Sequence, residues 1–218
     1  MPLDTYANLQ TAVMDWLARP GDPLIAPALP EMIQLFEAEA RLRLRTLASE
    51  AMAELYTAAG TPDLALPPDF VELRSAMLQG LATPLEFLAP HAAAPYTAAG
   101  GVPCYYTIYG GGDWACSAED GAFLRLSPPP DGAYTVTITY LRGLPALSDA
   151  APTNWLLLQS PGAYLWGCLV EAEAYIGHDE RAAAWLQRRD AALAALEIAD
   201  RKARWGGPLT MRVMGATP

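Results

Sequence analysis

The chain has 218 residues, of which 52% are hydrophobic and 17% are charged, enough apolar sequence for one large domain or two small ones with a core. The longest apolar run, around residues 163–170, is too short to cross a bilayer, and the N-terminus lacks the basic and apolar blocks of a signal peptide, so we expect a protein of cytoplasmic origin with no membrane segment. The net charge of −10 is uneven, with fifteen acidic and three basic residues in 46–180 but seven basic and three acidic in 181–218, which argues against a protein that wraps nucleic acid and for two faces with different partners.

Two helices are predicted in the first 45 residues. The first runs over 5–18, with Asp4 as its N-cap, and ends at Pro20-Gly21. The second begins near Pro30 and presents on one face the apolar residues Ile33, Phe36 and Ala40. Two ion pairs at the favoured four-residue spacing are expected to support it, namely Glu37–Arg41 and Glu39–Arg43.

The pattern changes from helix to strand after residue 46. Residues 46–58 favour helix by propensity but also fit the alternation of a strand, so their own composition leaves both alternatives open. The segments RSAMLQG (74–80) and PLEFLA (84–89) have the spacing of a hairpin. We expect this part of the chain to be mainly β-structure.

Residues 103–142 carry the clearest strand pattern in the chain. Tyr105, Tyr106 and Tyr109 lie in one candidate strand, and a Pro-Pro-Pro-Asp-Gly turn separates the next two. In the last strand, threonines alternate with Tyr134, Val136, Ile138 and Tyr140. The spacing predicts an antiparallel meander with one buried face.

Helical patterns return after residue 150. Thr153 is the expected cap of a short helix, Ser160-Pro161 opens an apolar helix that Gly177 ends, and Asp179 opens a long one that ends at Gly206-Gly207-Pro208. The expected supporting ion pairs of the long helix are Glu197–Arg201 and Asp200–Arg204.

Helices at both ends of the chain with strands between them predict an α+β fold, a helical bundle formed by the N- and C-terminal helices with an inserted antiparallel β domain. The expected divisions are the N-terminal helices of the bundle (1–45), the β-rich insertion (46–147), the C-terminal helices (148–205) and a C-terminal docking tail (206–218).

No pattern for a catalytic, metal or cofactor site emerges. The serines have no nucleophile-elbow frame, the two histidines are far apart, and the three cysteines form no C-x-x-C pair. Gly110, Gly111 and Gly112 follow a strand, but with no lysine and no helix after them they indicate a turn rather than a phosphate loop. We therefore expect no catalytic residues, no metal, no cofactor, and no hydrolase or transferase activity.

Two clusters of polar or aromatic residues can be interpreted as functional sites, but a structural role is favoured for each. Asp69, Glu72 and Arg74 are close in sequence, but without a histidine partner they indicate helix capping and an ion pair. Tyr105, Tyr106, Tyr109 and Trp114 could stack single-stranded nucleic acid, but that requires a basic groove, and the acidic surroundings favour a sheet core or a protein interface.

The order of these segments resembles the head-to-tail adaptor, or connector, proteins of tailed bacteriophages and gene transfer agents. The matching segments span nearly the whole chain, and they include TYANLQTAVMDWL (5–17), IQLFEAEARLRLR (33–45), LPPDFVELRS (66–75), PCYYTIYG (103–110), LRLSPPPDGAYTVTITYLRGLPALSD (124–149) and the long stretch that begins APTNWLLLQSPGAYLW (151–166). The resemblance implies that 46–58 is extended, although this chain has Ala, Glu and Met where the family has Thr and Leu.

The resemblance also implies a function and partners. A member of this family is a non-enzymatic structural protein of the virion neck, made in the host cytoplasm, that forms a homo-oligomeric ring of twelve copies. The ring joins the portal protein to the tail or nozzle protein, and DNA only passes through its channel during ejection. Another tail-completion or tail-tube protein is the alternative, although tube proteins usually lack two long terminal helices.

The basic C-terminal segment is the expected contact with the portal. We predict that 201–218 is a docking arm that orders only on binding the portal, because the apolar residues of its tail alternate with polar ones as in an added strand. The portal-docking residues are expected to be Arg201, Lys202, Arg204, Trp205, Leu209, Met211, Arg212 and Val213.

Overall fold

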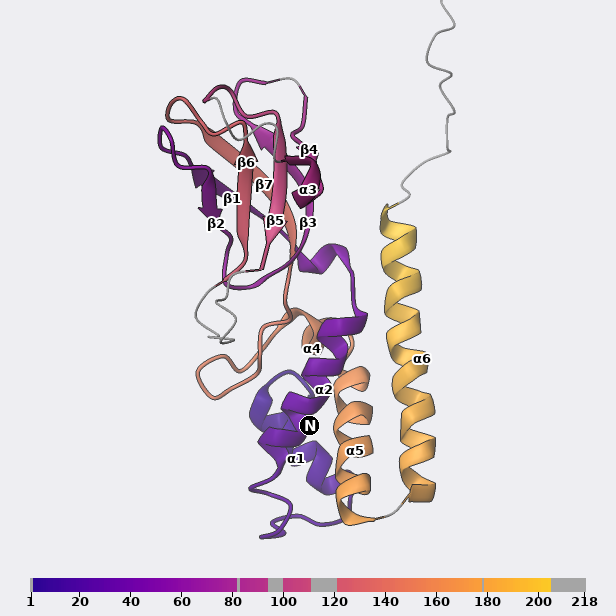
Figure 1. The fold of residues 1–218 in the computed structure, drawn as a ribbon. Coiled ribbons are helices and arrows are strands. Elements are labelled where there is room, and N and C mark those ends of the chain that lie inside the picture. Colours follow the sequence, from indigo (N-terminus) through magenta and orange to yellow (C-terminus); the bar gives the residue numbers. More distant parts are fainter. Residues whose placement is uncertain (1, 82, 94–99, 111–120, 178, 205–218) are drawn as a thin grey trace, which may run out of the picture. The chain divides into compact units, whose positions relative to one another are not determined.

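The computed structural model describes residues 2–81, 83–93, 100–110, 121–177 and 179–204. The chain forms two compact units, a helical unit of Met1–Ala48 with Leu144–Pro218 and a β unit of Ser49–Gly143 (Figure 1). The terminal helices pack together and the strands of the insertion form two sheets. The α+β class expected from the sequence is confirmed.

The helical unit is organised about one apolar helix. Its elements are α1 (Tyr6–Trp16), α2 (Leu29–Arg43), a 3₁₀ turn η1 that begins at Leu47, α4 (Trp155–Gln159), α5 (Pro161–Ile176) and α6 (Asp179–Arg204). Helix α5 contacts α1, α2, α4 and α6, and its fully buried Tyr164 meets the ring of Phe36 edge-on at 5.0 Å. The core of this unit therefore lies around α5.

Gly167 lets α2 and α5 approach closely. A Cβ atom at this position would lie under 3.0 Å from three carbon atoms of the buried Phe36 ring. Glycine is unfavourable inside a helix by about 1 kcal/mol relative to alanine, so the close packing of the two helices explains its presence.

Two of the predicted helix caps are one residue off. The N-cap of α1 is Thr5, whose Oγ1 accepts from the Asn8 amide at 3.3 Å, and not Asp4. The N-cap of α4 is Asn154, whose Oδ1 accepts from the Leu157 amide at 2.9 Å, and not Thr153. In both cases the cap has extended backbone angles, and adjacent capping residue types in a sequence do not reveal which one adopts them. Gly177 ends α5 in the left-handed conformation, as predicted.

The β unit consists of two sheets that enclose one core. The first has the order β1 (Glu50–Tyr56), β7 (Thr135–Arg142), β3 (Phe70–Leu78), and the second has the order β2 (Asp63–Ala65), β6 (Phe123–Ser127), β5 (Tyr105–Tyr109), β4 (Glu86–Phe87). A single turn of helix, α3 (Pro90–Ala93), follows β4. The buried cluster draws on both sheets and includes Ala76, Leu78, Leu124, Leu126, Val136 and Ile138.

The β unit resolves one open alternative and corrects two predictions. Residues 50–56 form a strand antiparallel to β7, so the segment that propensity left ambiguous is extended.

The predicted meander is only partly right. Strands β5 and β6 pair antiparallel, whereas β7 is the central strand of the other sheet. The prolines at 128–130 lack the N–H groups that would continue the ladder. The predicted 74–89 hairpin is reduced to a bridge between Met77 and Pro84, and β4 pairs in parallel with β5.

Candidate functional site

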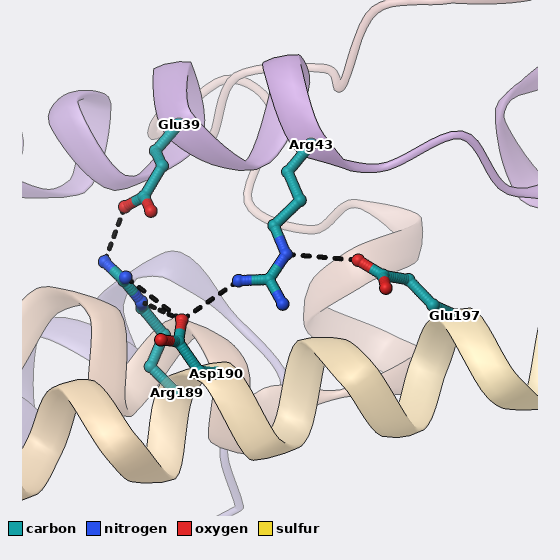
Figure 2. Close-up of polar contacts among 5 residues, drawn as sticks. All are labelled: Glu39, Arg43, Arg189, Asp190 and Glu197. Carbon is teal, nitrogen blue, oxygen red and sulfur yellow. Dashed lines mark hydrogen bonds and ion pairs between the residues drawn. The ribbon is translucent and has the colours of Figure 1, made fainter.

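An ionic network fastens α6 to α2 (Figure 2). Arg43 of α2 donates from Nη1 to Asp190 Oδ1 at 2.9 Å and from Nε to Glu197 Oε1 at 3.1 Å. In the opposite direction, Arg189 of α6 donates to Glu39 Oε2 at 2.5 Å, and it also bonds Asp190 at 3.1 Å. The network joins residues about 150 positions apart and holds the C-terminal helix in place.

The ionisation of the network is stabilised by its own contacts. Partial burial of Asp190 disfavours its charge, but hydrogen bonds from Arg189 and Arg43 outweigh burial and lower the pKa of the carboxyl. Burial likewise opposes the charge of Arg43, while the bonds to Glu197 and Asp190 raise its pKa. Both shifts favour the charged forms of Asp190 and Arg43, so these two side chains act as a clamp between the helices.

The network replaces two of the ion pairs predicted within single helices. Glu39 pairs with Arg189 instead of Arg43, and Glu197 pairs with Arg43 instead of Arg201. The predicted pair Asp200–Arg204 is confirmed, with Nε to Oδ2 at 2.7 Å. The four-residue rule describes an isolated helix, and here the facing helix offers a better-buried partner.

The turn between α5 and α6 is held by a second, more buried pair. Glu173 is fully buried, and its Oε1 accepts from Arg181 Nε at 3.1 Å and from Trp185 Nε1 at 3.5 Å. Trp185 also stacks on Trp166 of α5 with the ring centroids 5.3 Å apart. Trp16 of α1 meets both rings edge-on, and the Arg188 guanidinium covers Trp166 and Trp185. These contacts tie the start of α6 to α1 and α5.

A buried carboxylate connects α2 with the segment that leads back from the β unit. Glu37 is only 2% exposed, and its Oε1 accepts from the Leu147 amide at 2.9 Å and from the Tyr164 hydroxyl at 3.0 Å. Asn154 donates to the Tyr164 oxygen and to the Pro145 carbonyl. Burial raises the pKa of Glu37, and the two hydrogen bonds only partly oppose this effect.

The end of α6 is joined to the segment that follows α2. Asp200 Oδ1 accepts from the Leu47 amide at 2.6 Å, and Arg204 donates from Nη2 to the Arg45 carbonyl at 3.1 Å. A groove with a volume of about 240 Å³ lies between these two segments. The last turn of α6 thus borders a preformed depression in the helical unit.

The structure covers only part of the predicted docking residues. Arg201 and Lys202 are exposed on the last turn of α6, whereas Arg204 is half-buried and bonded to Asp200 and Arg45. The other predicted residues lie outside the described part of the chain, namely Trp205, Leu209, Met211, Arg212 and Val213.

The remaining candidates for chemistry have structural roles where they are described. Asp69 accepts from the Tyr140 hydroxyl at 3.0 Å, and Arg74 lies 3.9 Å from Glu72, so the predicted ion pair forms, but on strand β3 rather than at a helix cap. Tyr106 packs into the core of the β unit and against Phe87, and Tyr109 lies under the Arg125 guanidinium. Gly111, Gly112 and Trp114 lie outside the described residues.

Among the described residues, neither the cysteines nor the possible metal ligands form a reactive or metal-binding site. Cys168 is buried, which raises the pKa of its thiol, whereas Cys104 is exposed. Across the described ranges, no three His, Cys, Asp or Glu side chains are grouped so that they could hold a metal ion. What the site offers is a set of contacts that position a helix.

The sequence contained signals for the two residues that matter most in these contacts. Glu37 follows Ile33 by four positions and precedes Ala40 by three, so it lies on the apolar face of α2. Arg189 lies four positions from both Trp185 and Leu193 on the inner face of α6. A charged residue in register with a buried stripe signals a buried polar contact.

The comparisons place the chain in a family. Among the helices that the structure describes, none has the length and apolarity to cross a membrane. A comparison with curated proteins gave no match. The sequence matches the SU10 adaptor protein family over residues 4–212, nearly the whole chain, and the protein therefore belongs to this family of phage head-to-tail adaptor proteins.

Proposed function

We propose that the protein forms a ring in the virion neck that joins the portal to the tail and lines the channel through which DNA is ejected. The family match over residues 4–212 carries this proposal. The described polar clusters are consistent with it, because they link helices to one another instead of lining a reactive cleft. Their role is to hold a shape to which other proteins attach, without catalysis.

The excess of acidic residues in the β unit is consistent with a channel that DNA passes without being bound. Residues 49–143 contain ten acidic and three basic residues. A negative lumen repels DNA phosphate and lets the genome slide, whereas a basic one would bind it through the release of counterions. The proposed relation to DNA is therefore passage without binding.

The proposed partners are the portal, the tail or nozzle protein, and further copies of the chain, twelve in all by analogy with the family. The basic end of α6 and the tail behind it supply the portal contact, through Arg201, Lys202, Arg204, Trp205, Leu209, Met211, Arg212 and Val213. Arg201 and Lys202 support this assignment, because they are exposed at the end of a helix that the ionic network holds in place.

Co-sedimentation with purified portal rings tests the assignment. Deleting 206–218 should leave the chain folded and abolish attachment, because the contacts removed are with the partner. The double variant Arg201→Ala and Lys202→Ala should weaken attachment about tenfold or more, as expected for two charged contacts of about 1 kcal/mol each.

A matched control separates a local contact from a general effect of charge. Ala191→Glu with Ala195→Glu makes the same change in net charge at two exposed positions further back on α6. It should bind portal rings like the unmodified chain. If the chain lacking 206–218 bound portal rings as tightly as the full-length chain, the docking-arm assignment would be wrong.

A further inference from the structure

The outer sides of α2 and α6 form one surface of the helical unit. Both helices pack against α5, with Phe36 of α2 and Leu193 of α6 buried, and the ionic network joins the two helices side by side (Figure 2). The sides opposite the buried residues therefore point away from α5 and lie next to each other. This surface, which we call the α2–α6 face, exposes large apolar side chains, with Leu35 59%, Leu42 78% and Ile198 51% exposed.

The α6 half of the face is symmetric about Ala191. Its exposed residues follow one another at four, three and four positions in both directions from this centre, namely Glu180, Ala184, Gln187, Ala191, Ala195, Ile198 and Lys202. Residues at such spacings lie on one side of a helix. An antiparallel second copy of α6 centred on Ala191 therefore places Glu180 opposite the partner's Lys202, and the small Ala184 opposite the partner's Ile198.

The α2 half of the face has a similar symmetry about Ala38. Leu35 lies three residues before this centre and Leu42 four residues after it, and both are exposed. An antiparallel second copy of α2 therefore brings Leu35 opposite the partner's Leu42. It also brings the acidic first turn of the helix opposite the partner's basic last turn, where Arg41 and Arg45 are exposed. Apolar residues then meet apolar residues, and acids meet bases.

One two-fold axis satisfies both halves of the face. The network fixes the offset between the helices through the pairs Glu39–Arg189 and Arg43–Glu197, whose residue numbers differ by 150 and 154. The centres of the two halves differ by 153, so they lie at about the same level along the helices. Because residue numbers rise together in these pairs, α2 and α6 run in the same direction. A two-fold axis at this level makes each helix antiparallel to its own copy.

We propose that two copies of the free chain form a dimer through their α2–α6 faces, with α2 against α2 and α6 against α6. The matched charges favour a second copy as the occupant, since acid and base stand at equal distances from the centre of the α6 half. A contact of this kind closes on two copies, whereas a ring is built from two different faces. The dimer therefore belongs to the chain before assembly. The inference goes beyond the proposed function and does not depend on it.

Exchange of the charges on α6 tests the pairing in the full-length chain. Lys202→Glu sets two acids opposite each other at both ends of the contact, and we expect the dissociation constant of the dimer in analytical ultracentrifugation to rise about tenfold or more. Glu180→Lys combined with Lys202→Glu restores opposite charges in reversed order and should return the constant to near its original value. As a control, Arg201→Glu makes the same change in charge beside the stripe and should have little effect.

Two outcomes of the sedimentation experiment would overturn the proposal. One is an unmodified chain that sediments as a monomer at every concentration tested. The other is a dimer that Lys202→Glu does not weaken or that the double exchange does not restore, because a different face would then hold the two copies together.

Disulfide formation tests the two-fold axis itself. In a chain with Cys104→Ser and Cys116→Ser, Ala191→Cys places one thiol of each copy at the axis, and the buried Cys168 is kept because burial raises the pKa of its thiol. Under mild oxidation we expect a covalent dimer on non-reducing gels to form about tenfold or more faster than with Ala183→Cys, which is exposed on another side of α6. Equal rates would contradict the axis. Both experiments use the chain without portal, so their failure is distinct from a failure of the adaptor role.

Discussion

At the scale of single residues, Glu37 contributes to the pH dependence of the stability of the helical unit. Its pKa is raised above the ordinary value of 4.5 by burial, so the folded chain binds this proton more tightly than the unfolded chain. The stability contributed by Glu37 is therefore full below about pH 4.5 and is lost as the pH rises through its raised pKa.

Replacing Glu37 by Gln should remove this dependence. The amide oxygen can still accept from Leu147 and Tyr164, but it does not titrate. The free energy of unfolding of Glu37→Gln relative to the unmodified chain should increase with pH above about 4.5 and then level off. Chemical denaturation at a series of pH values measures this, with the exposed Glu31→Gln on the same helix as control. A difference independent of pH would contradict the assignment.

Arg189 is the residue on which the clamp between α2 and α6 depends most. It is almost fully buried, whereas its partners Glu39 and Asp190 are more than a third exposed, so solvent screens part of the interaction. We expect Arg189→Ala to lower the free energy of unfolding by about 1–2 kcal/mol, and the loss to shrink at high ionic strength. Gln187→Ala, an exposed neighbour, should change little. A loss insensitive to salt would point to packing alone.

At the scale of elements, Gly167 sets the approach of α2 and α5. Gly167→Ala should gain about 1 kcal/mol in helix propensity but lose about 1–3 kcal/mol through overpacking against Phe36. We expect a net destabilisation in thermal and urea unfolding. Gly162→Ala in the same helix should cost less, because the nearest atom to its Cβ would be the Trp166 indole nitrogen at 3.3 Å and not ring carbons under 3.0 Å.

A second substitution tests whether Phe36 is the cause. Adding Phe36→Leu to Gly167→Ala should recover part of the loss, because the bulk that meets the new methyl group is removed. The two substitutions should therefore be coupled in a double-mutant cycle. Additive effects would show that the cost of Gly167→Ala arises elsewhere.

The elements also show where sequence reasoning succeeds and fails. Gly177 and the alternation of Thr with Val136 and Ile138 predict a helix end and a strand correctly, because a single backbone conformation or a single buried face decides them. The partners of β7 could not be predicted, since they come from Glu50–Tyr56 and Phe70–Leu78, far away in sequence. Strand pairing depends on packing that no local pattern contains.

At the scale of the whole molecule, the order of helices, strands and helices was sufficient to predict an α+β fold with a β insertion. The contacts that position α6 were not predicted, because Arg43 and Glu39 have partners about 150 residues away and also have plausible partners within α2. Charged residues in register with apolar ones indicate that a buried contact exists. They do not indicate with which element it is made.

We propose that this chain assembles on the portal as an adaptor. Imaging of purified protein mixed with purified portal by negative-stain electron microscopy tests it most directly, with the truncated chain lacking 206–218 as the comparison. We expect an added ring of density on the tail-facing end of the portal with the full-length chain, and bare portals with the truncated one. Bare portals with the full-length chain, or assembly of the chain into tubes that ignore the portal, would contradict it.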